Sequence, residues 1–312
     1  MEYIQFVLGL IFLIAGGEAL VKGSVGIALK LRISTLVIGM TIVSFGTSAP
    51  ELLVAIKAAL KEKPDIAIGA VLGSNISNIA LILGLTALIF PMKVSRDSIY
   101  IDWPVMMFST LLFWWLIQDG YLHLTDGIGF VFFLIFFSTW LIWRSRKKQK
   151  KKEDAPVIKA TVKAYFRDIT LMLIGLLGLA FGSDLFIDGA DDIAVNLGVP
   201  QRIIALTIVA VGTSMPELIT SMVAAFRRQV DISVGNLIGS NIFNLLSILG
   251  ITSIIKEIPI NKIFIQYDVF WLLGITFLIL PIMFTRRQIS RIEGVILVTS
   301  YIAFIYFVVN KS

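Results

Sequence analysis

Long apolar runs, separated by short polar segments, dominate this chain. An apolar run of about 20 residues is long enough to cross a bilayer as an α-helix. The runs are continuous and lack period-two alternation, which argues against a transmembrane β-barrel. The pattern therefore predicts an all-α polytopic membrane protein. Its ten predicted transmembrane helices lie at residues 3–22, 33–59, 66–90, 99–118, 126–144, 166–189, 200–226, 232–256, 266–285 and 291–309.

Composition supports a membrane protein with little soluble mass, because 57% of the residues are hydrophobic and only 15% are charged. The chain has no cysteine, which excludes disulfides, thiolate metal ligands and cysteine nucleophiles. The apolar N-terminus lacks a basic leader region and a cleavage site, so we interpret it as the first transmembrane helix. The lone histidine, His123, is predicted to be a solvated surface residue. No constellation typical of an enzyme is present, and no cofactor or obligate protein partner is predicted.

The only long polar segment separates the fifth and sixth predicted helices. Ten of the 27 Lys and Arg residues lie between Arg144 and Arg167, so the positive charge is too concentrated for a nucleic-acid face. We predict a solvated basic linker at residues 146–165, cytoplasmic by the positive-inside rule. Loops on that side hold 20 Lys and Arg, against 7 on the other. This places a multi-pass protein in the plasma or inner membrane, with both termini outside.

One segment occurs twice, at a constant offset of 166 residues. Residues 41–89 and 207–255 align without a gap, and 24 of the 49 aligned positions are identical. The likeness continues outward, so we predict one five-helix repeat at 1–145, with its motif at about 39–90, and another at 166–312, with its motif at about 205–256. Because five is odd, the second repeat must insert upside down. Lys22 and its counterpart Asp188 are therefore predicted at opposite membrane faces. Inverted repeats underlie alternating access in several transporter folds.

Each copy contains a glutamate in a Gly-Thr-Ser-x-Pro-Glu motif within an apolar run. Proline inside a helix removes an amide donor and displaces the carbonyl one turn earlier, which for Pro50 belongs to Gly46. A freed carbonyl in a membrane needs a partner, and a bound cation is one such partner. The hydroxyls and carboxylates add hard oxygen donors suited to Ca2+, Na+ or Mg2+. These donors are Thr47, Ser48 and Glu51 in the first copy and Thr213, Ser214 and Glu217 in the second.

The next predicted helix of each repeat supplies neutral oxygens. Ser74 and Asn78 are four residues apart and share a helix face, as do Ser240 and Asn244. Two alternatives remain open for these motifs. The proline segment could be a structural kink, and the amides could serve interhelical hydrogen bonds.

Charge counting constrains the transported ion. Two carboxylates neutralise one Ca2+, or hold two or three Na+ with help from neutral oxygens. Leaving both ionised and empty in a low-dielectric site is costly, which favours exchange over the return of an empty carrier. Na+/Ca2+ antiport, coupling to H+, transport of Mn2+ or Mg2+, and a non-transport role as a membrane enzyme or scaffold all remain open at this stage.

At these motifs, GTSAPEL with GSNISN and GTSMPEL with GSNIFN, the chain resembles the sodium/calcium exchanger family of the calcium:cation antiporter superfamily. The resemblance covers essentially the whole chain. It implies a ten-helix inverted-repeat fold in which Glu51, Glu217, Thr47 and Thr213 coordinate Ca2+ at mid-membrane. The sodium sites would be completed by Ser48, Ser74, Asn78, Ser214, Ser240 and Asn244. It also implies that the first and sixth helices slide across the other eight.

Three observations refine the resemblance. Potassium-dependent exchangers and some archaeal members carry Asp where this chain has Asn244, which argues against potassium dependence. The signature of the proton-coupled exchangers is not found in either copy. The linker is too short to fold a calcium-sensing domain, so the chain resembles the short prokaryotic type of exchanger.

Overall fold

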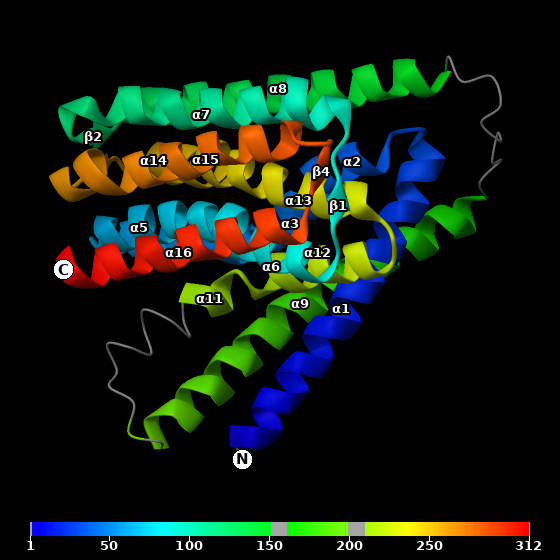
Figure 1. Cartoon of the computed structure of the whole chain (residues 1–312), viewed down its shortest axis with the longest axis horizontal. Helices are drawn as coiled ribbons and strands as arrows, with labels where there is room; N and C mark the ends of the chain where they lie inside the picture. The colour runs from blue at the N-terminus through cyan, green and yellow to red at the C-terminus, as the bar shows by residue number, and fades with distance from the viewer. Residues whose placement is uncertain (1, 151–160, 197, 199–209, 312) are drawn as a thin grey trace. The chain divides into compact units, whose positions relative to one another are not determined.

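The computed structural model describes residues 2–150, 161–196, 198 and 210–311, and nearly all of its elements are helices (Figure 1). The α-helices are α1 (Glu2–Leu31), α2 (Thr35–Ile38), α3 (Ser44–Thr47), α4 (Ala49–Leu60), α5 (Pro64–Ile76), α6 (Leu83–Ile89), α7 (Trp103–Leu116), α8 (Leu124–Lys150), α9 (Val162–Asn196), α11 (Ala210–Thr213), α12 (Met215–Phe226), α13 (Val230–Phe243), α14 (Gly250–Ile255), α15 (Val269–Phe284) and α16 (Arg291–Lys311). The strands are β1 (Met92–Lys93), β2 (Tyr121–Leu122), β3 (Ile258–Pro259) and β4 (Gln288–Ile289). Turns of π-helix lie at Gly39–Val43, Ser77–Ile82, Ser98–Asp102, Asn244–Leu249 and Phe264–Asp268.

The described residues contain eight helices that are long and apolar enough to cross a membrane. A ninth span is the pair Thr35–Thr47 and Ala49–Leu60, which is bent by 44°. The seventh predicted helix, 200–226, is described only from residue 210 and contains the short apolar helix α12. The all-α polytopic prediction is confirmed. Helices α8 and α9 extend further than predicted, to Lys150 and from Val162, and residues 151–160 of the predicted linker lie outside the described residues.

The repeat seen in the sequence is also present in the secondary structure. Helices α4 and α12, strands β1 and β3, and the starts of α7 and α15 are each separated by 166 residues. The π-helical turns at Ser98–Asp102 and Phe264–Asp268 follow the same offset. The π-helical turns and the short strands recur at the same offset as the α-helices, so the two repeats have the same local structure.

The chain forms two compact units, each drawing on both repeats. The first unit contains Met1–Thr47 and Trp140–Asn236, and the second contains Ser48–Thr139 and Leu237–Ser312.

In the first unit, α1 and α9 pack along their lengths through glycines spaced seven residues apart. These glycines are Gly9, Gly16 and Gly23 in α1 and Gly175, Gly182 and Gly189 in α9. A Cβ atom on Gly16 would lie 2.8 Å from the backbone nitrogen of Leu179, so the backbones touch directly. Gly9 meets Phe186 and Gly23 meets Met172, so α1 and α9 run antiparallel. Small residues that permit such close approach are typical of helix pairs in membranes.

The same helix pair contains a buried ion pair between Lys30 of α1 and Asp168 of α9. Arg167 Nε lies 3.0 Å from the other oxygen of the Asp168 carboxylate. The hydroxyl of Tyr165 also donates to the carbonyl of Lys30, at 3.1 Å. These contacts join the end of α1 to the beginning of α9.

In the second unit, two short strand pairs establish the inversion. β1, before α7, pairs antiparallel with β4, which follows α15. β2, after α7, pairs antiparallel with β3, which precedes α15. The start of α7 is therefore at the same end of this unit as the finish of α15, so these equivalent helices run in opposite directions (Figure 1). Together with the α1–α9 pair, this confirms the predicted inversion.

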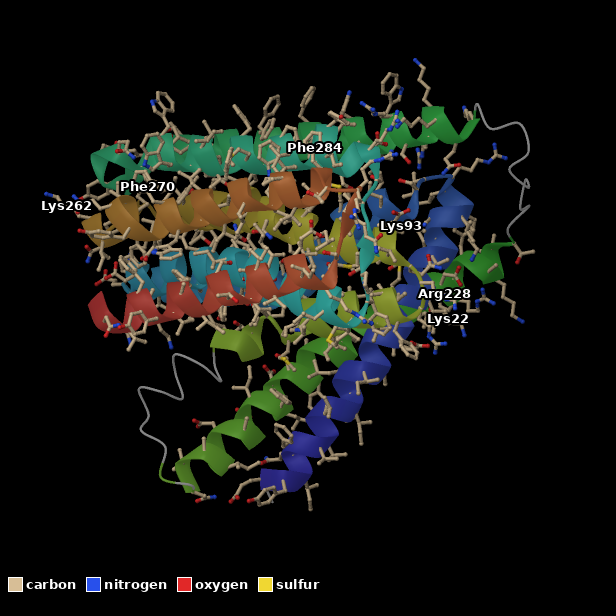
Figure 2. All side chains as sticks on the ribbon, viewed as in Figure 1. Lys22, Lys93, Arg228, Lys262, Phe270 and Phe284 are labelled. Carbon is tan, nitrogen blue, oxygen red and sulfur yellow. The ribbon has the colours of Figure 1, made fainter. Side chains whose placement is uncertain are left out.

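Exposed aromatic residues lie at both ends of α15, and exposed basic residues occur in both units (Figure 2). Phe270 and Phe284 lie at the two ends of α15 and are 52% and 49% exposed. Lys262 and Lys93, in the second unit, are exposed, as are Lys22 and Arg228 in the first. Aromatic and long basic side chains at helix ends are typical of residues that sit at the membrane–water interface.

Candidate cation-binding site

Each proline motif breaks its helix in the same way. α3 ends at Thr47 and α4 starts at Ala49, with Ser48 between them in a non-helical conformation. Pro50 then occupies the first turn of α4, where its missing amide hydrogen costs nothing. Sequence reasoning had placed this proline in the middle of one kinked helix. The structure instead shows two half-helices, because proline is tolerated at a helix start and not in its interior.

The glutamates of the two motifs are fully enclosed by protein. Glu51 is 2% exposed and Glu217 is 0% exposed, and each lies in the first turn of a half-helix. The amino-terminal end of a helix favours negative charge, because the peptide dipoles place positive charge there. Glu51 belongs to the second unit and Glu217 to the first. A carboxylate buried within membrane-spanning segments is typical of a functional site.

The second unit also holds most of the neutral oxygens predicted from sequence. Besides Glu51 it contains Ser48, Ser74, Asn78, Ser240 and Asn244, all buried. The amide nitrogen of Asn244 donates to Ser74 Oγ at 3.2 Å, which leaves the amide oxygen directed elsewhere. Among the described residues, that oxygen, both amide atoms of Asn78 and Ser240 Oγ have no hydrogen-bond partner.

Buried amide and hydroxyl oxygens without partners are costly, and a bound cation would satisfy them. Asn78 and Asn244 also lie in π-helical turns, which occur frequently at functional sites. Two further amides each donate one hydrogen bond, Asn75 Nδ2 to the carbonyl of Asn241 and Asn241 Nδ2 to that of Leu237. Their amide oxygens also have no hydrogen-bond partner among the described residues.

The first unit contains Thr47, Thr213, Ser214 and Glu217. Ser214 is buried, whereas Thr213 is only half-buried. Thr47 is buried, and its hydroxyl lies 3.2 Å from the amide oxygen of Asn236. The ten predicted residues are thus divided between the units, six in the second and four in the first.

One carbonyl displaced by a proline has a partner within the first unit. Ser183 of α9 donates its hydroxyl to the carbonyl of Gly212 at 2.9 Å. Gly212 is the counterpart of Gly46, for whose carbonyl a cation was one possible partner. In the second copy, a side-chain hydroxyl takes that place.

Sequence reasoning missed several buried polar residues beside the motifs. Asn236, Ser221 and Ser183 were not singled out, although each breaks the repeat, with Ala70, Ala55 and Gly17 at the equivalent positions. Comparing the two copies for polar replacements of small apolar residues would have found them.

A second duplicated carboxylate was also missed. Asp102 is fully buried in a π-helical turn of the second unit, and its counterpart is Asp268. Asp102 directly precedes α7 and Asp268 directly precedes α15. An acidic residue at the start of an apolar helix in both repeats is a pattern that can be detected in the sequence.

The described residues contain no cluster of three or more His, Cys, Asp or Glu side chains that could hold a metal ion. A cation bound at the proline motifs would therefore be held mainly by hydroxyl, amide and backbone oxygens, with few carboxylates. This donor chemistry suits Na+ and Ca2+ better than a soft transition metal.

His123 lies outside this group, beside β2 of the second unit. Its Nε2 is 3.0 Å from Asp119 Oδ2, and its Nδ1 is 3.3 Å from Glu257 Oε1. The hydrogen bond to Asp119, followed by the one to Glu257, raises the pKa of His123 above its ordinary value. The residue is a surface residue, as predicted, but it links the two loops that carry β2 and β3.

Comparisons with known proteins agree over almost the whole chain. The family model described as sodium/calcium exchanger protein matches residues 1–143 and 168–310. The chain is 36% identical to the putative antiporter CaxA of Alkalimonas amylolytica, covering 97% of each chain. It is 30% identical to the sodium/calcium exchanger MaX1 of Methanosarcina acetivorans, covering 98% of this chain and 97% of the relative.

A solved structure shares the same fold. The sodium-calcium exchanger NCX_Mj, soaked without Na+ and Ca2+, superposes with a TM-score of 0.86 at 31% identity, covering 98% of each chain. The chain is therefore a multi-pass membrane protein, and it belongs to the sodium/calcium exchanger family.

Proposed function

We propose that this chain is a secondary active antiporter that exchanges Na+ for Ca2+ by alternating access. The observation that carries the proposal is the duplicated half-helix break, which buries one glutamate in each repeat. Relatives named as sodium/calcium exchangers, similar over nearly their whole length, support the same ions for this chain.

The proposed ligands are the ten oxygen-bearing side chains of the two motifs. Glu51 and Glu217 supply the charge, and the duplication of the motif favours their use in one shared site. The neutral ligands are Thr47, Ser48, Ser74, Asn78, Thr213, Ser214, Ser240 and Asn244. Seven of them are buried and Thr213 is half-buried. Further support comes from the helix breaks and from the oxygens of Asn78, Ser240 and Asn244, which have no hydrogen-bond partner among the described residues.

Exchange follows from the charge of this site. Two ionised carboxylates without a counter-ion are expensive in a low-dielectric medium. Either one Ca2+ or two to three Na+ would offset that cost, and the two ions compete for the same oxygens. The loaded forms therefore cross between the two facing states more readily than the empty one. The inverted repeats supply two such states of similar structure.

The orientation of the chain is part of the same proposal. The concentration of Lys and Arg near the linker favours a cytoplasmic linker and external termini. Because the chain has no native cysteine, single-cysteine variants at Lys22 and Asp188 can be labelled directly with a membrane-impermeant maleimide. In sealed spheroplasts, Asp188→Cys should react and Lys22→Cys should not. The reverse pattern would invert the orientation.

The function is tested with purified protein in liposomes. Vesicles loaded with Na+ and diluted into Na+-free 45Ca2+ buffer should accumulate the isotope, and Glu217→Gln should abolish the uptake. A second set of vesicles carries only a pH gradient. Uptake driven solely by that gradient would replace Na+ with H+ as the coupling ion. Absence of Ca2+ uptake under either gradient would contradict Ca2+ transport and would lead to Mn2+ and Mg2+ as test ions.

A further inference from the structure

Asn236 is a fully buried amide of α13 within the first unit. Its side chain contacts two other elements of that unit. The hydroxyl of Thr47, at the end of α3, donates to Asn236 Oδ1 at 3.2 Å, and Asn236 Nδ2 donates to Ser221 Oγ of α12 at 3.1 Å. Its backbone carbonyl accepts from Ser44 Oγ at 3.0 Å. Asn236 therefore joins α3 and α12 of the first unit through hydrogen bonds.

This arrangement fixes how the Thr47 hydroxyl can act. A hydroxyl has one hydrogen to donate and two lone pairs to offer. The neighbouring acceptors of Thr47 are the Asn236 amide oxygen at 3.2 Å and the carbonyl of Ser44 at 3.3 Å. With its hydrogen directed at these acceptors, Oγ1 keeps its lone pairs for another partner. Donation into an amide oxygen also polarises the O–H bond and increases the negative charge on Oγ1.

The contact with Ser221 holds the amide in this orientation. Without a partner for Nδ2, the amide could turn and present its hydrogens to Thr47, which would consume a lone pair of the hydroxyl. The Ser221 oxygen gives Nδ2 an acceptor on the opposite side. A buried polar network whose members all have partners is rigid and selects one arrangement.

The other repeat lacks these two side chains. The counterparts of Asn236 and Ser221 are Ala70 and Ala55, whereas the threonine itself is retained as Thr213. The polar pair is therefore a feature of one copy and not a consequence of the shared fold.

We propose that Asn236 is a positioning residue for Thr47, holding its hydroxyl as an oxygen donor to the transported cation, with Ser221 fixing the amide. This inference rests on the proposed function, because it takes Thr47 as a cation ligand. The support differs between the repeats, because the positions equivalent to Asn236 and Ser221 are Ala70 and Ala55.

The test is a double-mutant cycle on Ca2+ affinity, measured by 45Ca2+ binding to the purified full-length chain. Asn236→Leu and Thr47→Val, both close in shape to the native residues, should each weaken Ca2+ binding by about tenfold. The double variant should be no weaker than Thr47→Val alone, because Asn236 acts through that hydroxyl. Ser221→Ala should weaken binding less than Asn236→Leu does.

A matched control lies in the first unit. Thr41 is buried, and its hydroxyl donates to the carbonyl of Val37, one helical turn earlier. Thr41→Val should leave Ca2+ affinity within about twofold of wild type. Thermal unfolding of every variant separates a loss of affinity from a loss of stability.

The positioning role would be overturned if the double variant lost Ca2+ affinity by the product of the losses in Asn236→Leu and Thr47→Val. A loss of thermal stability in Asn236→Leu with unchanged Ca2+ affinity would also overturn it, because that is the signature of a purely structural residue. In either case wild-type Ca2+ binding and Na+-driven uptake would stand, so the proposed function would survive. A wild-type chain that bound no Ca2+ would overturn both proposals.

Discussion

The two copies of the proline motif share their oxygen donors and differ in what supports them. Both keep Gly-Thr-Ser-x-Pro-Glu, and both break the helix at the serine. Thr47 is held by Asn236, which is itself held by Ser221. The corresponding positions in the other copy are Ala70 and Ala55. Duplication thus preserved the candidate ligands, while the residues beside them diverged and made the copies chemically unequal.

The backbone of the motifs shows a second difference. The carbonyl of Gly212 accepts a hydrogen bond from Ser183 of α9. The counterpart of Ser183 is Gly17, which has no hydroxyl to donate to the other copy. A similar inequality occurs in the second unit, where Asn244 is bonded to Ser74.

The largest expected effect comes from removing what the copies share. Glu51→Gln and Glu217→Gln should each lower Na+-driven Ca2+ uptake by more than about 100-fold, because a divalent ion loses half of its compensating charge at a buried site. Glu62→Gln is the control, since that carboxylate is exposed at the surface. Uptake into proteoliposomes gives the rates, and size-exclusion profiles report folding. Full activity in either buried variant would remove the basis of the proposed site.

The next effect tests the unequal amides. A double-mutant cycle with Ser74→Ala and Asn244→Ala should show a coupling of about 1 kcal/mol in Ca2+ affinity. Either substitution alone already removes the hydrogen bond between the two side chains, so the second substitution costs less. The equivalent cycle with Ser240→Ala and Asn78→Ala should be nearly additive, since Asn78 has no hydrogen-bond partner among the described residues. Isotope binding measures both cycles. Equal coupling in the two would show that the copies are equivalent at these positions.

A smaller effect is expected on stability. Ser183→Ala leaves the buried carbonyl of Gly212 without its donor, which should cost about 1–3 kcal/mol. Ser24→Ala is a matched control, because this buried serine of α1 has no hydrogen-bond partner among the described residues. Thermal unfolding in detergent should show a lower midpoint for Ser183→Ala only. Equal midpoints would mean that the carbonyl is satisfied in another way.

The smallest effect concerns the loops at the ends of α7 and α15. The pKa of His123 is raised in the folded chain by its hydrogen bonds to Asp119 and Glu257. Protonation therefore stabilises the fold; this contribution is complete below the unfolded pKa of about 6.5 and is lost as pH rises through the higher folded pKa.

The other repeat supplies the matched substitution for this test. Ser290 directly follows β4, as His123 directly follows β2, and its hydroxyl accepts from the backbone nitrogen of Glu293 at the start of α16. His123→Ser copies that cap and should flatten the pH dependence of thermal unfolding between about pH 5 and about pH 8. An unchanged pH profile in His123→Ser would assign the titration to another group.

Several features of the fold follow from local chemistry and could be predicted. Continuous apolar runs determine transmembrane helices because the bilayer admits few other structures. The constant offset with an odd number of helices predicts inversion, which the strand pairs β1–β4 and β2–β3 confirm. The helix lengths were predicted less well, since α8 and α9 continue into the polar segment, where apolarity no longer marks a helix.

For the candidate site, the sequence by itself singled out the candidate donors, because an ionisable side chain repeated within an apolar run is costly and therefore informative. Only the tertiary structure decided how those donors are held. It paired Thr47 with Asn236, Asn244 with Ser74, and the Gly212 carbonyl with Ser183. These partners are separated from one another by 29 to 189 residues along the chain. Hydrogen bonds between such distant positions depend on helix packing, which no local pattern of residues encodes.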